Sequence, residues 1–553
     1  MKLNSLTKAP RTTNTRKTAD HNDRSDHVAA HPHVKQHLNF WQLWVWWLIP
    51  AAIALTLVVW FVDPFIGDWD GLDYTMLSVA GYPSSMALGR NLFIFQNHFL
   101  YRAGNFLFNV RPDQAYLIFK YSVVAQAPLA VIACWALARQ VGASLHAATL
   151  AALFVVFSPV FVLYGGQVMT DVPSVLLLAV ALIIHLRGLQ QNRIWLVLLG
   201  AAVLGLGMNL RETMGFYLPW LIAAPFASGW KLTKRNVIVI LISLVLFLLC
   251  GLGWFAFWFI TDDHYRRIWF GWRESMRQET ERHPVTVKNL WPYLGYFFVS
   301  APLVFVSLIP ALWSEWRKHR VSQMFLLAAV GLVANLALFF NYSTAINWRY
   351  FLTGLPALAP ICACFLLAAV APRLRSVKVA FASAVVVLIA LAITFSLLIR
   401  PASKQFITRR AMSKEYRRQL AQLPSDAVLI SGSQTIAVTY WKAMGAGSWK
   451  TIGTGGGWPG DENLVGVIED HLQHGRRVFI DTDPRWWLPC GWQRSEIPAI
   501  AKLENHFRFR RATDTVYEVR PQWDNTASDA PNLQKLLPEN RPEDTQKCPP
   551  LQG

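Results

Sequence analysis

Apolar runs long enough to cross a membrane recur along the first four hundred residues. They lie at residues 41–62, 115–138, 144–164, 172–189, 194–210, 214–229, 236–260, 291–312, 322–341, 351–371 and 378–399. A helix needs roughly 20 apolar residues to span the hydrocarbon core, and the runs at 172–189 and 214–229 are near the short limit. The pattern predicts a polytopic α-helical membrane protein with about eleven transmembrane helices.

The connections between these runs alternate in charge. Every second connection is basic, through Arg139, Arg187, Arg193, Lys231, Lys234, Arg235, Arg317, Lys318, Arg320, Arg373, Arg375 and Lys378. The intervening connections hold nearly all of the carboxylates. Because basic loops remain in the cytoplasm, we expect a cytoplasmic N-terminus, an acidic outer face and, with an odd number of helices, an outer C-terminal region.

Composition and charge agree with this topology. The chain has 553 residues, of which 54% are hydrophobic, and a formal net charge of +19. Such a composition is too apolar for a water-soluble protein. We attribute the excess of positive charge to the cytoplasmic loops and their contact with anionic lipids, not to nucleic-acid binding. The expected location is the inner (plasma) membrane.

The chain divides into four predicted parts. Residues 1–40 are polar and basic, which is typical of disordered cytoplasmic sequence. Residues 41–399 form the membrane domain. Residues 400–523 form a small extracytoplasmic α/β domain, with strands at 427–431 and 477–481 and helices at 413–422 and 462–474. Residues 524–553 resemble a loose tail.

The first outer loop, residues 63–113, is unusually long, and long loops often carry function. It begins with acids, among them Asp68, Asp70 and Asp73. Acids beside a membrane are costly unless they pair, bind cations or take part in chemistry. A further acid, Asp171, opens the run at 172–189, where a purely structural role at the helix N-terminus is the alternative.

Cations and polar aromatic residues are expected on the same outer side as these acids. The candidate substrate-binding residues are Tyr74, Arg90, His98, Arg102, Arg211, Arg349 and Tyr350. An isolated Arg at a helix end is usually an anchor for lipid headgroups. Arginines that converge with carboxylates on one face favour a phosphate-bearing substrate instead.

Four motifs, in this order, resemble those of the GT-C glycosyltransferases. The chain is similar to the branch that contains protein O-mannosyltransferases and aminoarabinose lipid A transferases, over about residues 41–400. The family's Asp-Glu-x-x-Tyr motif corresponds to residues 70–74, where Gly71 replaces the Glu and leaves room for Asp73 to share the acidic role. The other motifs are residues 170–173, 204–213 and 349–356.

The resemblance implies a membrane glycosyltransferase with a polyprenyl-phosphate-linked sugar as its donor. In this interpretation Asp70 is the catalytic base, with Asp171 and Asp73 as further catalytic candidates. Arg349 and Arg211 would bind the leaving phosphate. Asp171 would hold the acceptor, orient an Arg or help to ligate a divalent cation such as Mg²⁺ or Mn²⁺. Transfer would be a single in-line displacement with inversion.

Two other classes of protein are the alternatives. A flippase or transporter of lipid-linked sugars predicts acids at the bilayer midplane and two related halves, and a non-catalytic envelope assembly protein leaves the acidic loop unexplained. The sequence leaves open the sugar, the acceptor, metal dependence and oligomeric state. It also leaves open whether Cys490 and Cys548, the two cysteines expected outside, form a disulfide.

Overall fold

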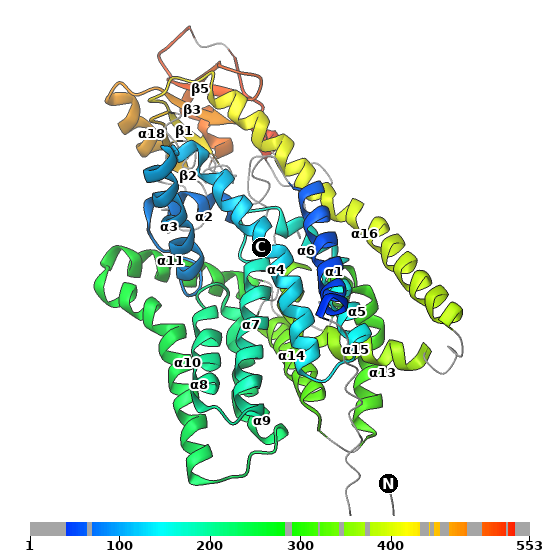
Figure 1. The fold of residues 1–553 in the computed structure, drawn as a ribbon. Helices are drawn as coiled ribbons and strands as arrows, with labels where there is room; N and C mark the ends of the chain where they lie inside the picture. The colour runs from blue at the N-terminus through cyan, green and yellow to red at the C-terminus, as the bar shows by residue number, and fades with distance from the viewer. Residues whose placement is uncertain are drawn as a thin grey trace, which may run out of the picture. The chain divides into compact units, whose positions relative to one another are not determined.

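The computed structural model (Figure 1) describes eleven stretches of the chain. These are residues 40–62, 69–282, 290–318, 321–341, 348–370, 377–431, 442, 447–453, 464–483, 500–526 and 529–536. Contacts divide the chain into residues 1–43 and a second unit, residues 44–553. The predicted N-terminal segment falls almost entirely outside the described residues, as do Asp63, Asp68, Cys490 and Cys548.

Helices account for most of the described chain. The α-helices up to residue 261 are α1 (Phe40–Trp60), α2 (Trp69–Ala80), α3 (Asn91–Phe108), α4 (Ala115–Gln140), α5 (Leu145–Val156), α6 (Pro159–Gly165), α7 (Asp171–Gln190), α8 (Ile194–Gly207), α9 (Leu218–Ala227) and α10 (Lys234–Thr261). Those that follow are α11 (Asp263–Arg282), α12 (Leu290–Ser300), α13 (Pro302–Trp316), α14 (Gln323–Asn341), α15 (Leu355–Val370), α16 (Val377–Leu420) and α18 (Leu464–Gln473). Short 3₁₀ segments include η1 (Pro112–Gln114), η2 (Glu212–Tyr217), η4 (Trp348–Gly354), η9 (Lys502–Asn505) and η10 (Leu533–Leu536).

Each of the predicted apolar runs falls on one of these helices or on two consecutive ones. Within the described residues, five helices are long and apolar enough to cross a membrane, or up to seven if each of two bent pairs is one span. Shorter apolar helices cover Trp44–Trp60, Ile194–Gly207 and Gln323–Ala337. The chain is therefore an integral membrane protein, and the count of eleven spans stays a prediction.

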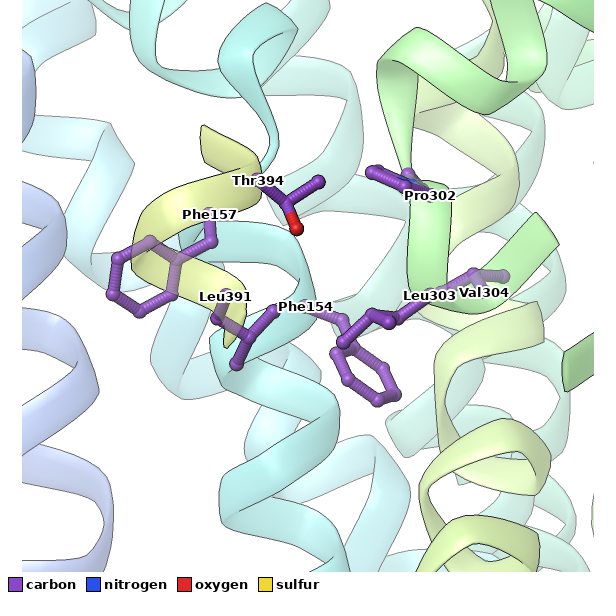
Figure 2. A pocket seen from close by; sticks show the side chains of 8 residues that line it. Phe154, Phe157, Pro302, Leu303, Val304, Leu391 and Thr394 are labelled. Carbon is purple, nitrogen blue, oxygen red and sulfur yellow. The ribbon is translucent and has the colours of Figure 1, made fainter. Parts of the chain in front are cut away.

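The two bent pairs turn where a proline follows a non-helical residue. The axis turns by 63° between α5 and α6 and by 106° between α12 and α13. Pro159 and Pro302 occupy the first turn of α6 and α13, where proline is tolerated but disfavours helix in the residue before it. A small pocket lies between these bends and α16, lined by apolar side chains that include Phe154, Leu303 and Leu391 (Figure 2).

Close helix packing forms the centre of the membrane domain. Helix α7 packs against α4 and α8, and α8 packs against α10. At Gly205 a side chain would stand 2.2 Å from the carbonyl oxygen of Phe247, and at Gly188 it would stand 2.5 Å from the backbone nitrogen of Val197. Small residues at these contacts let the backbones approach, as is common in membrane bundles.

The C-terminal region contains a mixed five-stranded sheet in the order β2-β1-β3-β5-β4. Its strands are β1 (Val428–Ser431), β2 (Lys450–Gly453), β3 (Val478–Asp481), β4 (Phe507–Arg511) and β5 (Val516–Pro521). β1 pairs in parallel with β2 and β3, whereas β5 is antiparallel to β3 and β4. Two strands and the helix α18 thus lie where the sequence predicts them.

Two of the predicted domain boundaries, which stay predictions, fall next to or inside described elements. Residue 400 lies within α16, which continues to Leu420 as one helix although Pro401 lies inside it. Part of the expected tail is ordered as η10, whose Leu533 is buried in the core of the sheet with Val428 and Ile480.

Candidate active site

Helix α2 carries the acidic motif. Asp70 lies in its first turn, where a carboxylate is favoured by the helix dipole. Asp73 and Tyr74 follow one turn later, so all three residues share one face. Tyr74 is buried, and its ring meets that of Phe93 on α3 at 5.6 Å between centroids. The stretch predicted as a long loop therefore contains two packed helices, α2 and α3.

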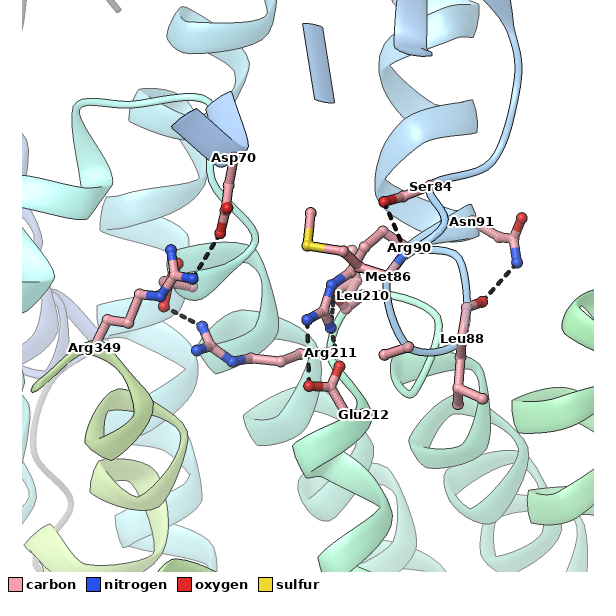
Figure 3. Close-up of polar contacts among 12 residues, drawn as sticks. Asp70, Ser84, Met86, Leu88, Arg90, Asn91, Leu210, Arg211, Glu212 and Arg349 are labelled. Atoms are coloured by element: carbon pink, nitrogen blue, oxygen red, sulfur yellow. Dashed lines mark hydrogen bonds and ion pairs between the residues drawn. The ribbon is translucent and has the colours of Figure 1, made fainter. Parts of the chain in front are cut away.

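Asp70 is paired with a distant arginine. The guanidinium of Arg349 donates to the Asp70 carboxylate, with Nη2 and Oδ2 2.6 Å apart (Figure 3). The two residues are 279 positions apart in the chain, and both side chains are largely shielded, with 16% and 22% exposure. Asp70 is thus an ion-paired acid at a helix end rather than a solvated acid of a loop.

A second pair, Asp171 with Arg211, is fully buried. The two side chains are 0% and 2% exposed and form an ion pair between the start of α7 and the residue before η2. The Tyr350 ring lies 4.6 Å from Cζ of Arg211 and 5.5 Å from Cζ of Arg349. The ring therefore joins the two pairs, and Asp171 sets the direction of the Arg211 guanidinium.

The third pair is Arg90 with Glu212, the neighbour of Arg211. Nη2 of Arg90 donates to Oε1 of Glu212 at 3.2 Å, and Nη1 donates to the carbonyl oxygen of Leu210 at 3.4 Å. Burial raises the pKa of Glu212, but Arg90 and Arg211 outweigh it and hold that pKa at about 2. Arg90 therefore bonds to the protein itself, and its contacts fix the position of the Glu212 carboxylate.

The loop from Gly81 to Arg90 connects α2 to this third pair. Ala87 and Arg90 have φ angles of 46° and 49°, in the left-handed region that non-glycine residues seldom occupy. The Ser84 hydroxyl donates to Oδ2 of Asp73 at 3.3 Å. The indole of Trp269, on α11, donates to the carbonyl of Ala87 at 2.8 Å. Contacts on both sides thus hold a strained backbone beside the acids of α2, as is common at functional sites.

Two predicted substrate-binding residues lie apart from the three pairs. Nδ1 of His98 is 2.8 Å from the carbonyl oxygen of Ser78, so His98 ties α3 to α2. Arg102 is exposed on α3, and within the described ranges no hydrogen bond or ion pair connects it to the cluster. The substrate-binding roles of His98 and Arg102 stay predictions. The two residues are four positions apart on α3 and so share one face of that helix, away from the three pairs.

Three residues that the sequence does not identify as candidates contact the pairs or are buried charges in the structure. Glu212 pairs with Arg90, and the Tyr164 ring lies 5.9 Å from Cζ of Arg349. Lys120 is buried in α4, with its Nζ 5.2 Å from the ring centroid of Tyr116 and 5.4 Å from that of Tyr121. The available signals were an acid directly after Arg211 and a single lysine inside an apolar run.

The described residues contain no recognisable metal centre. In these ranges no three His, Cys, Asp or Glu side chains gather as potential ligands. A groove of about 590 Å³ lies between α3 and α4, lined by residues such as Gln96, Phe99 and Leu129. The groove is largely apolar and includes none of the paired arginines.

Known proteins resemble the chain mainly in fold. Residues 97–254, from α3 to α10, match the family model described as dolichyl-phosphate-mannose-protein mannosyltransferase. This segment contains Asp171, Arg211 and Glu212 but is less than half of the chain. A comparison with curated protein sequences finds no match.

Three solved structures are similar at low sequence identity. ArnT from Cupriavidus metallidurans, bound to undecaprenyl phosphate, is 14% identical with a TM-score of 0.52, over 88% of this chain and 100% of that chain. The S. cerevisiae protein O-mannosyltransferase Pmt1–Pmt2 complex bound to the sugar donor is 13% identical with a TM-score of 0.33, over 40% and 34%. An Archaeoglobus fulgidus oligosaccharyltransferase, in complex with Zn and sulfate, is 12% identical with a TM-score of 0.46, over 87% and 73%. The ArnT match, which spans that whole chain, confirms the resemblance that the motifs implied: this chain has the fold of the GT-C glycosyltransferases.

Proposed function

We propose that this protein transfers a sugar from a polyprenyl-phosphate donor to an acceptor on the extracytoplasmic side of the inner (plasma) membrane. The observation that carries the proposal is the set of three arginine–carboxylate pairs, through Arg349, Arg211 and Arg90, which meet at helix ends. Planar guanidinium groups recognise phosphate oxygens through two parallel hydrogen bonds. The fold adds the expectation that the lipid part of the donor lies among the helices.

The two arginines nearest Tyr350 are suited to the donor phosphate. Arg349 and Arg211 lie against the same ring, and Arg349 keeps some exposure whereas Arg211 does not. We assign direct contact with the phosphate to Arg349. Arg211, which is buried against the same ring, would contribute positive charge without touching the phosphate. Preorganised positive charge at this point stabilises the phosphate as it leaves with the bonding electrons.

The reaction also requires a base for the acceptor hydroxyl. The hydroxyl oxygen attacks the sugar carbon that bears the phosphate, the bond from that carbon to the phosphate oxygen breaks, and the hydroxyl proton passes to a carboxylate. Asp70 and Asp73, both on α2, are the candidates for this role. No step of the proposal passes through Mg²⁺ or Mn²⁺, and activity measured with and without a chelator tests whether a divalent cation is needed.

The test is transfer by the purified protein in lipid nanodiscs. Labelled polyprenyl-phosphate sugars, presented with membrane and envelope extracts as acceptors, should lose the sugar to an acceptor and release polyprenyl phosphate. A flippase would move the intact donor across a bilayer and leave its phosphate–sugar bond in place. An assembly protein would do neither, so product analysis separates the three classes.

A further inference from the structure

The two acids of α2 lie in different surroundings. Asp70 is held by Arg349 at 2.6 Å. Asp73 has no arginine partner in the described structure; its hydrogen-bond donor is the Ser84 hydroxyl, at 3.3 Å. An adjacent guanidinium favours the ionised carboxylate and makes it a weak base, whereas a carboxylate bonded to a hydroxyl keeps more of its proton affinity.

The Ser84 hydroxyl is fixed as a donor. Its oxygen accepts a hydrogen bond from the backbone N–H of Met86 at 3.2 Å, so its proton is directed to Oδ2 of Asp73. The backbone N–H of Ser84 is itself bonded to the carbonyl of Gly89, at 2.9 Å. The strained loop thus occupies one oxygen of Asp73. Asp73 as a whole residue is half-buried rather than fully enclosed, which leaves room for an incoming hydroxyl.

Burial and the neighbouring carboxylate of Asp70 both weaken the ionised form of Asp73. Burial contributes most, Asp70 adds to it, and the Ser84 hydrogen bond opposes both, so that the pKa of Asp73 rises to about 7. A general base works best when its pKa is close to the operating pH. Asp73 has that property through its position on α2.

Other charged groups around α2 are engaged elsewhere. Helices α3 and α4 pack against α2. Arg90, at the start of α3, is bound to Glu212, and His98 is bound to the carbonyl of Ser78. Lys120, on α4, lies over the rings of Tyr116 and Tyr121. From η4, Arg349 reaches Asp70.

We propose that Asp73 is the general base of the transfer and that Asp70 instead holds Arg349 in position for the donor phosphate. The inference rests on the proposed function and assigns the proton within it. The acceptor O–H proton goes to the free oxygen of Asp73, the acceptor oxygen bonds to the sugar carbon, and the phosphate departs with the electron pair toward Arg349. Ser84 is a positioning residue, because it acts through Asp73.

The experiment compares Asp73→Asn, Asp70→Asn and Ser84→Ala with the wild-type protein in nanodiscs. Donor affinity is measured with a non-transferable polyprenyl-phosphate sugar, and transfer is measured across pH 5–9. Asp73→Asn should retain donor binding and lose transfer by roughly 10²–10⁴-fold. Asp70→Asn should weaken donor binding. Asp263→Asn, whose carboxyl is 78% exposed on α11, is the matched control and should behave as wild type.

The midpoint of the transfer–pH curve tests the assigned roles, because a purely structural role of Ser84 would leave this midpoint unchanged. Transfer by the wild-type protein should rise with pH and level off above about pH 7. Ser84→Ala removes the hydrogen bond that lowers the pKa of Asp73, so the midpoint should move to higher pH. The residual transfer of Asp70→Asn should show a midpoint at lower pH, because a neighbouring negative charge is gone.

The outcomes separate this inference from the proposed function. If Asp73→Asn transfers normally while Asp70→Asn binds donor and is inactive, Asp70 is the base and the inference is wrong. An unchanged midpoint in Ser84→Ala would also overturn it. If the wild-type protein transfers no sugar from any polyprenyl-phosphate donor, the proposed function fails, and this inference fails with it.

Discussion

The buried pair of Asp171 and Arg211 makes a quantitative prediction. With exposures of 0% and 2%, neither side chain can turn to solvent if its partner is removed. Removing one member of a buried ion pair typically costs 3–5 kcal/mol, because the other charge remains buried without compensation. In Asp171→Asn the amide oxygen still accepts a hydrogen bond, and the Tyr350 ring at 4.6 Å still attracts the guanidinium. We therefore expect a loss at the lower end, about 3 kcal/mol.

A double replacement separates the charge from the packing. Asp171→Leu with Arg211→Met removes both charges and roughly keeps the apolar volume, a change that is often neutral or stabilising in other buried pairs. The double variant should therefore be more stable than either single variant, although it should not transfer sugar. Exposed Asp263, paired with Arg266 on α11, provides the control, since exposed pairs contribute little.

Unfolding in mixed micelles of increasing SDS fraction gives the measurement, once refolding from the same micelles has been verified. Asp171→Asn should unfold at a lower SDS fraction than the wild-type protein. If the two proteins unfold together, the pair contributes no net stability and its burial has been misjudged. If the double variant is less stable than both single variants, the pair is needed for packing rather than for charge compensation.

Three further predictions concern topology, donor binding and pH. Reporter fusions at Thr233 and Ser403 should show opposite sidedness, and cytoplasmic activity at both would refute the assumed helix count. Arg349→Ala should weaken donor binding by about ten- to a hundredfold, as expected for lost hydrogen bonds between charged groups. Arg349→Lys should restore only part of the lost affinity, because lysine lacks the planar fork of arginine. Unchanged donor affinity in both variants would remove Arg349 from the phosphate site. The lowered pKa of Glu212 contributes stability that is present above about pH 4.5 and is lost as pH falls toward 2. The difference in melting temperature between wild type and Glu212→Gln should therefore shrink as pH falls over that interval. A constant difference would contradict the pairing of Glu212 with Arg90.

The sequence predicted the helices well and their bends poorly. The apolar runs fix where helices form because every backbone group in a bilayer must be bonded internally. A run of apolar residues does not reveal that two helices meet at an angle of 63° or 106°. Pro159 and Pro302 are the available signals, and each lies inside an apolar run that the pattern predicts as a single span.

The residue types of the candidate site could be read from the sequence, whereas their pairing could not. The arginines and acids expected on the outer face follow from charge and from the family motifs. Their partners could not be predicted in this way, because Asp70 and Arg349 are 279 positions apart and Arg90 and Glu212 are 122 apart. Only packing decides which acid each guanidinium meets. For the same reason the motif favours Asp70 over Asp73 as the base, because the sequence does not show that Asp70 is ion-paired with Arg349.

The paired arrangement also explains why a fourth, unpaired acid is useful. The three arginines are balanced by Asp70, Asp171 and Glu212, so the cluster itself has little net charge. During transfer one negative charge must appear on the departing phosphate, and a buried site tolerates such a change poorly unless another charge disappears. A proton accepted by Asp73 removes one negative charge from α2 while the phosphate gains one beside Arg349. The net charge then stays constant through the reaction, which is the physical advantage of placing a weakly acidic carboxyl one helical turn from an ion-paired one.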